Sequence, residues 1–221
     1  YFDLRTCANH HALHPKGEDD SPCGHMTPAA HDDDPPIVCG DACNVQVFAT
    51  KVSDIISLAM YGEEFARGAR YGPNLFAETL SSDTEPQFIC DVWQSPAMKL
   101  LHVDLQHQYG EMNGLIPSAT YLPIVIELFA DGFNPFAKTT AYSLWAITLR
   151  FLNLPPSIRS KYRHLHPLVL IRGPKEPTSI DVYLARVVDE LNALYKDGLI
   201  MYDSHTGWYV QIRVTVLCVA H

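Results

Sequence analysis

The order of apolar segments in residues 119–221 constrains the fold of this chain more than any other feature. Three apolar runs follow one another at 121–131, 141–154 and 166–173, and their β-branched and aromatic content is typical of strands. The connection between the first two runs is short, which favours an antiparallel pair. The segment therefore predicts an α/β domain that begins with a three-stranded meander.

A helix and a fourth strand complete this pattern. Apolar residues recur at helical spacing from Ile180 to Tyr195, and Gly198 follows as a capping residue. Val210 to Val216 alternate with polar residues and run into an apolar end, which predicts a strand. A crossover helix between strands of one sheet is right-handed in nearly all proteins, and it can place this strand parallel to the first. Asp131, at the end of the first strand, would then face the side chain that follows His221.

The first half of the chain has a different hydrophobic pattern. Residues 1–43 show no hydrophobic period, whereas the apolar residues from Val45 to Ala59 recur at helical spacing. The segment "GEEFARGARYG" predicts a second short helix and "GPN" a loop, while Ser95 and Pro96 form a good helix start. We therefore predict three parts: a small module at 1–43, a helical connecting region at 44–118 and an α/β domain at 119–221.

Charge is distributed unevenly along the chain. The formal net charge is -9, which argues against a surface that is basic throughout. The segment 141–175, however, carries six bases and no acid, so it forms either a set of solvated loop charges or a strip that faces phosphates. The bases are Arg150, Arg159, Lys161, Arg163, Arg172 and Lys175.

The sequence shows no apolar run long enough to span a membrane and no signal-peptide pattern, so we expect an intracellular protein without a membrane partner. The first residue is Tyr1 and the final residues resemble a strand without a closing turn. Both ends therefore look cut.

Cysteine and histidine concentrate in residues 1–43, which are too poor in apolar residues to form a core alone. Thiolate and imidazole ligands hold zinc tetrahedrally, and such a segment needs this kind of support. The alternatives are a His-rich disordered tail and disulfides. Cys90 and Cys218 stand in apolar surroundings and are expected to be buried thiols. The best zinc set is Cys7, His10, Cys23 and Cys39, with His25 and Cys43 as substitutes.

Two common catalytic arrangements are missing from the sequence. No G-x-S-x-G nucleophile elbow is present, which argues against an α/β hydrolase, and there is no phosphate loop of the Walker type. Asp131 is the notable carboxylate because it ends an apolar strand. It either caps the following turn or serves a functional site.

The C-terminal half resembles a known family. The segments "DGFNPF", "YSLWAITLRFLNLPPSIR", "LVLIRGPKEPTSIDVYLARVVDEL" and "VTVLCVAH" resemble the start of the catalytic domain of Tnp2-like transposases of the CACTA (En/Spm) superfamily, in their fungal form. The N-terminal segments "CANHHALHP", "SPCGH" and "CGDAC" resemble the degenerate zinc ribbon that precedes this domain, with His10 in place of a usual cysteine.

This resemblance implies a partial RNase H-like domain after a zinc-ribbon-like module and a helical segment. It also implies that Asp131 is the first ligand of an Asp-Asp-Glu set that holds two Mg²⁺ or Mn²⁺ ions for DNA cleavage and joining. In the family, the second aspartate directly follows the strand that resembles "VTVLCVAH", so it and the later glutamate would lie beyond His221. The resemblance further implies a nuclear location and transposon-end DNA as a partner.

Four other carboxylates are possible substitutes for the missing ligands. Asp181, Asp189 and Glu190 belong to the predicted crossover helix, where first-turn and exposed-face charges are ordinary, and Asp203 falls in the polar loop "YDSHTG". The sequence therefore predicts a transposase fragment truncated within its catalytic domain and inactive alone. The alternative is a zinc-containing module kept by a host for DNA or protein binding. Exposed apolar edges of a partial domain predict self-association.

Overall fold

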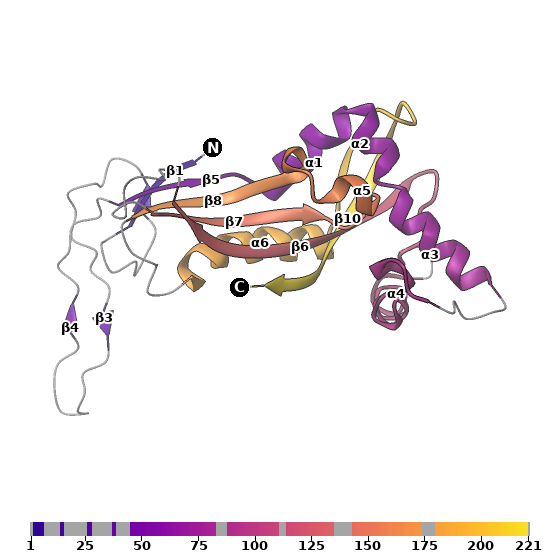
Figure 1. Ribbon diagram of the computed structural model, residues 1–221, viewed down its shortest axis with the longest axis horizontal. Helices are drawn as coiled ribbons and strands as arrows, with labels where there is room; N and C mark the ends of the chain where they lie inside the picture. The colour runs from indigo at the N-terminus through magenta and orange to yellow at the C-terminus, as the bar shows by residue number, and fades with distance from the viewer. Residues whose placement is uncertain are drawn as a thin grey trace.

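The structure is a computed structural model with mixed α/β architecture (Figure 1). Its main sheet has eight strands in the order β2-β1-β5-β8-β7-β6-β10-β9. A separate ribbon pairs β3 (Met26–Thr27) with β4 (Ile37–Val38). The structure describes residues 2–6, 14–15, 26–27, 37–38, 45–82, 88–110, 114–134, 143–173 and 180–220.

The predicted strand order of residues 119–221 is confirmed. Strands β6 (Tyr121–Phe133), β7 (Ser143–Phe151) and β8 (Leu165–Gly173) form an antiparallel meander. Helix α6 (Asp181–Lys196) then crosses the sheet, and β10 (Trp208–Ala220) runs parallel to β6. The pairing of Val214 with Ile124 sets the register, so the two buried strands share one apolar layer.

Within residues 45–221, two further strands were not predicted. Val45–Ala49 form β5 rather than the start of a helix, because they pair with the open edge of β8, and a short apolar run fits either period. Leu199–Asp203 form β9, which makes a hairpin with β10. Its turn uses a left-handed glycine, Gly207, at φ +76°.

In its described residues, the region predicted to be helical contains four α-helices and one 3-10 helix beside β5. Helix α1 (Val52–Tyr61) and α2 (Glu63–Gly68) follow the strand, and α4 (Pro96–Tyr109) begins at the predicted proline. The expected "GPN" loop instead lies inside α3 (Tyr71–Ser81). A Cβ atom on Gly72 would lie 2.2 Å from the Trp93 ring, so the glycine allows this helix to approach the short helix η1 (Val92–Gln94) closely.

The remaining elements complete both ends of the sheet. Strands β1 (Phe2–Thr6) and β2 (His14–Pro15) extend it beyond β5, so part of the predicted 1–43 module shares the main sheet. The basic loop predicted after β7 contains a short helix, α5 (Pro156–Arg159), and a 3-10 turn, η3 (Tyr162–His164).

Apolar cores lie on both faces of the sheet. Ile124 and Ile126 of β6 point into a core shared with α1 and α6, while Val125 between them points into a second core. The second core contains Phe76 of α3 and Trp93 of η1, both fully buried. Because both faces of β6 are covered at this level, the strand is fixed in register from each side.

A buried asparagine connects these layers. Asn153, directly after β7, has no exposed surface. Its Oδ1 accepts a hydrogen bond from the Val125 N–H at 2.7 Å, and its Nδ2 donates to the carbonyls of Ala69 and Pro123, each at 2.8 Å. One side chain thereby satisfies a strand donor and two acceptors, one of them beyond the end of α2.

An arginine makes a second connection between distant elements. The Nη1 of buried Arg213 donates to the Lys196 carbonyl at 2.6 Å and also to the Tyr195 carbonyl, so it satisfies acceptors at the C-terminal end of α6. Its guanidinium lies 3.9 Å from the centre of the Tyr109 ring of α4. Strand β10 is therefore tied to helices from both halves of the chain.

We expect Asn153→Ala to lower the free energy of unfolding by about 3 kcal/mol, because it leaves one buried N–H and two buried carbonyls without their partner. Urea unfolding monitored by circular dichroism would measure this change. Asn192→Ala, at an exposed position of α6, is the matched control and should change stability by less than about 0.5 kcal/mol. Equal effects of the two substitutions would contradict the role of Asn153.

Candidate functional site

Asp131 lies near the C-terminal end of β6 with its side chain exposed to solvent. The strand continues through Gly132 to Phe133 instead of ending at the aspartate, as the sequence had suggested. Asp131 pairs with Ala146 of β7, and a Cβ atom on Gly132 would lie 2.6 Å from the Trp145 ring. The glycine therefore lets the Trp145 ring pack against the backbone beside the carboxylate.

The parallel strand β10 ends beside the same part of β6. Its register pairs Val219 with Leu128 and Ala220 with Phe129. Continued without a shift, this register would bring the second residue after Ala220 opposite Asp131. That Asp131 faces the residue following His221 stays a prediction, since the observed register ends at Ala220.

A polar cluster surrounds Glu127, which lies four residues before Asp131 and therefore on the same face of β6. The Nε of Arg150 donates to Glu127 Oε2 at 2.7 Å, and its Nη1 donates to the Ser160 hydroxyl at 3.0 Å. The Cys218 thiol lies 3.3 Å from Glu127 Oε1. Partial desolvation by neighbouring atoms, followed by the hydrogen bond to this carboxylate, raises the pKa of Cys218, so the thiol stays protonated near neutral pH.

The expectation of two buried thiols was wrong. Cys90 and Cys218 are both exposed. Cys218 follows a register shift between Val216 and Cys218 at the end of β10, and Cys90 lies in the irregular segment before η1. Their apolar neighbours Ile89 and Val219 are exposed as well.

Three cations of the basic segment pair with carboxylates of the protein. Arg150 pairs with Glu127, Arg159 with Asp91 at 2.8 Å, and Arg163 with Glu64 at 2.7 Å. The Arg159–Asp91 pair is almost fully enclosed, with the two side chains 11% and 2% exposed, whereas the Arg163–Glu64 pair is 46% and 59% exposed.

The remaining predicted phosphate contacts are Lys161, Arg172 and Lys175. Lys161, in the loop before η3, and Arg172, near the end of β8, are exposed. Lys175 lies outside the described residues.

The four carboxylates weighed as substitute ligands do not gather around Asp131. Asp181 and Asp189 lie on exposed positions of α6. Asp203 belongs to β9 rather than to a loop, and its buried carboxylate pairs with Arg70. It also accepts hydrogen bonds from the His205 N–H and the Thr206 hydroxyl, each at 3.0 Å.

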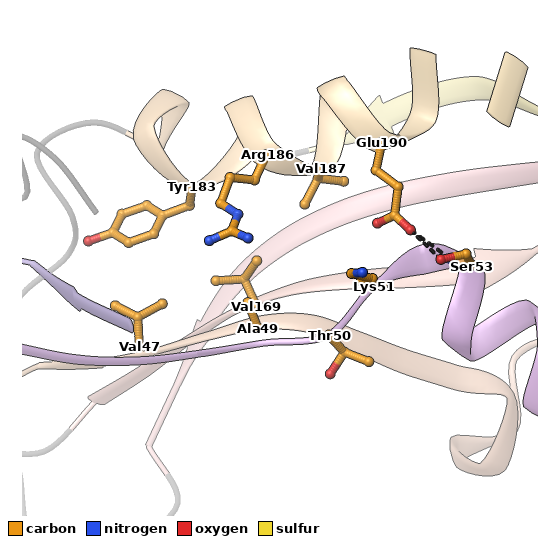
Figure 2. Close-up of a pocket in the computed structure, with 10 residues that line it drawn as sticks. All are labelled: Val47, Ala49, Thr50, Lys51, Ser53, Val169, Tyr183, Arg186, Val187 and Glu190. Atoms are coloured by element: carbon orange, nitrogen blue, oxygen red, sulfur yellow. Dashed lines mark hydrogen bonds between the residues drawn. The ribbon is translucent and has the colours of Figure 1, made fainter. Parts of the chain in front are cut away.

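Glu190 has a structural role that the sequence did not suggest. Its carboxylate accepts a hydrogen bond from the Val52 main-chain N–H at 2.9 Å. It also accepts hydrogen bonds from the Ser53 N–H at 3.0 Å and the Ser53 hydroxyl at 2.6 Å (Figure 2). The first turn of α1 is therefore capped by a residue of α6. Beside this contact, a cavity of about 230 Å³ separates α6 from β5, with Arg186 pointing into it (Figure 2).

The predicted zinc ligands Cys7, His10, Cys23 and Cys39 lie outside the described residues. Within the part of the chain that the structure describes, no three His, Cys, Asp or Glu side chains gather as a metal site. None of the described helices is long and apolar enough to cross a membrane.

A comparison with known families now bears on this geometry. Residues 119–221 match the model of the transposase family tnp2. This region is related to transposases. The match covers β6 to β10 together, including Asp131 and Asn153, and it indicates a transposase-related function. No curated protein matches the chain.

Asp203 gives the transposase-related region a measurable dependence on pH. Burial alone would raise the pKa of Asp203, but the hydrogen bond and charge of Arg70, with the His205 and Thr206 hydrogen bonds, hold this pKa below its usual value. A lowered pKa stabilises the fold fully above the unfolded value of about 3.9, and this contribution is lost as the pH falls through the folded value. Acidification should therefore remove it below about pH 4.

We expect Asp203→Asn to lower the free energy of unfolding by about 3 kcal/mol at pH 7, because the Arg70 guanidinium loses its buried partner. The variant should also lose the part of the acid dependence that Asp203 supplies. Urea unfolding at a series of pH values between 3 and 7 tests both points. Asp104→Asn, at an exposed position of α4, is the control. An unchanged acid profile in Asp203→Asn would contradict this assignment.

Proposed function

We propose that residues 119–221 form part of an RNase H-like catalytic domain for cut-and-paste DNA transposition of the CACTA (En/Spm) type. The family match and the strand order support this proposal together, because a three-stranded meander, a crossover helix and a parallel fourth strand is the order that such a domain requires. The position of Asp131 carries the proposal. Its exposed carboxylate lies where the end of β6 runs beside the end of β10.

The donor chemistry of this position suits a hard divalent cation. Mg²⁺ and Mn²⁺ prefer carboxylate oxygens, and Asp131 offers one on a strand that is fixed from both faces. When bound, two such ions stabilise the attacking and leaving oxygens of a phosphoryl displacement. A single carboxylate does not hold two ions. Asp131 would therefore act with a carboxylate two positions beyond Ala220 and with a later glutamate, as the family's Asp-Asp-Glu set implies.

The surroundings of Asp131 would hold its carboxylate in place. Gly132 allows the Trp145 ring to lie against the backbone next to it, and the pair with Ala146 ties it to β7. Glu127, four residues before Asp131, is bound by Arg150. Its carboxylate is therefore less available to a metal ion than that of Asp131. We assign Asp131 as a metal ligand and Glu127 as a positioning residue for the two neighbouring strands.

We also propose a structural zinc ion held by Cys7, His10, Cys23 and Cys39, in a module that precedes the catalytic region. The proposal rests on the ligand types and their spacing. Transposon-end DNA would be the partner, and the protein would act in the nucleus where that DNA resides. Exposed Lys161 and Arg172 are the proposed phosphate contacts, while Lys175 remains a candidate from the sequence.

The metal proposal is tested by calorimetry with Mn²⁺ on two chains, the present 221 residues and a chain that continues through the family's second aspartate and glutamate. We expect tight binding only in the longer chain, and Asp131→Asn should abolish both this binding and strand cleavage. Asp189→Asn, which removes an exposed carboxylate of α6, is the matched control. Cleavage that persists in Asp131→Asn would remove Asp131 from the site. Equal Mn²⁺ binding by both chains would favour the non-catalytic binding module.

The zinc proposal makes a separate prediction. Cys7→Ser and Cys39→Ser should each reduce the zinc content of the purified protein from about one ion per chain toward zero, because each removes one of four ligands. Atomic absorption measures this content. Cys218→Ser removes an exposed thiol elsewhere in the chain and should leave it unchanged. Full zinc content in both ligand variants would contradict the proposed set.

A further inference from the structure

His102, a buried histidine of α4, holds the bend that precedes β6. Its side chain lies edge-on to the Phe76 ring of α3, with 5.1 Å between the ring centres, and is 7% exposed. Its Nδ1 accepts a hydrogen bond from the Leu115 main-chain N–H at 2.8 Å. A neutral imidazole accepts at one nitrogen and donates at the other, whereas a protonated imidazole donates at both. This hydrogen bond therefore requires a neutral His102 with its proton on Nε2.

The bend at residues 114–116 fits closely against this ring. A Cβ atom on Gly114 would lie 2.3 Å from His102 Nδ1, so a larger residue there would collide with the imidazole. The Tyr121 hydroxyl donates to the Gly114 carbonyl at 3.1 Å, and the Leu115 side chain is fully buried in the second core. One histidine and one tyrosine thus attach the bend to α4 and to the start of β6.

The surroundings of the imidazole supply no negative charge to balance its protonated form. The titratable or charged side chains on the elements around it are Glu78, Asp104, His107, Tyr121 and Arg213. The first three are exposed. Burial raises the pKa of Tyr121 to about 12, so its phenol stays neutral, and Arg213 is buried against the end of α6. Burial is the cause that acts on the pKa of His102, and among the described residues no carboxylate raises it.

We propose that His102 is an acid-sensitive lock, which holds residues 114–116 against α4 when it is neutral and releases them when it is protonated. A proton on Nδ1 would point at the Leu115 N–H, so two donors would face each other inside an apolar core. Movement of the bend away from α4 relieves this conflict, because both groups then reach water. This inference does not depend on transposase activity.

The release is expected to be local. The ladder between β6 and β10 and the hydrogen bonds of Asn153 join main-chain and amide groups, which do not titrate between pH 5 and 8. His164 and His166 also have lowered pKa values through burial, but they contact aromatic rings of the core shared with α1 and α6. Their protonation therefore acts at a different place, and the lock needs a readout at the bend itself.

The direction of the effect follows from the lowered pKa of His102. Burial holds this pKa below its usual value of about 6.5, so the closed bend binds fewer protons than the open one. The closed bend is then unaffected well above about pH 6.5 and loses stability as the pH falls from there to the pKa of the closed state. Over this window the equilibrium constant for opening should rise by up to about tenfold for each pH unit.

The experiment is amide hydrogen exchange, followed by NMR on the 221-residue chain between pH 5 and 8 and expressed as protection factors. The Leu115 amide should lose protection by up to about tenfold per unit below about pH 6.5, and the Val125 amide, which is bound to Asn153, should not follow it. His102→Asn places an amide oxygen near the position of Nδ1 and should keep the Leu115 amide protected at every pH. His107→Asn, at an exposed position of α4, is the matched control and should keep the pH profile of the unaltered chain.

Three results would overturn the proposal: constant protection of the Leu115 amide, an equal loss in His102→Asn, or a parallel loss at Val125, which would mean global unfolding. A second measurement needs no variant. The nitrogen chemical shifts of the His102 ring should show the proton on Nε2 above about pH 7 and a pKa below about 6.5. A proton on Nδ1, or titration at the ordinary value, would equally contradict the lock.

Discussion

The three hydrogen bonds of Asn153 hold the two halves of this molecule in one arrangement. The side chain joins β6 to the end of α2, and the neighbouring main chain continues the connection, since the Gly72 N–H donates to the Asn153 carbonyl at 2.9 Å and the Trp93 indole to the Leu152 carbonyl at 2.8 Å. Each donor and acceptor is buried, so any shift of the helical layer would leave polar groups without partners. This cost fixes α3 and η1 against the sheet, and with them the core that covers one face of β6.

The fixed position of β6 also determines the environment of Asp131 near its C-terminal end. The strand is covered on both faces near Val125 but becomes exposed toward Asp131, where β7 and β10 are its neighbours. A carboxylate in this position has a rigid backbone and an open side-chain environment. That combination suits a metal ligand better than a capping residue, because no turn follows Asp131 directly and the strand continues to Phe133.

Local periodicity was sufficient to predict the strand order of residues 119–221, because each strand and α6 bury one continuous apolar face. It failed for β5 and β9, whose assignment depends on a partner strand rather than on their own pattern. It also could not identify the roles of Asn153 and Glu190, because their partners Ala69 and Val52 lie 84 and 138 positions away. The position of Asp131 was predictable, whereas the ion pairs of the basic segment were not, since each carboxylate comes from a different element.

The exposure of those ion pairs ranks their cations by how readily each could exchange its carboxylate partner for a phosphate of DNA. A phosphate can replace a carboxylate partner only where water already reaches the pair, because an enclosed pair would leave an uncompensated buried charge when it opens. Arg159 is held by nearly buried Asp91 and is therefore part of the scaffold, as is Arg150 with Glu127. Arg163 and Glu64 are both substantially exposed, so their pair contributes little and can exchange for a phosphate. Of these three paired cations, Arg163 is therefore the one that could exchange its carboxylate partner for a phosphate.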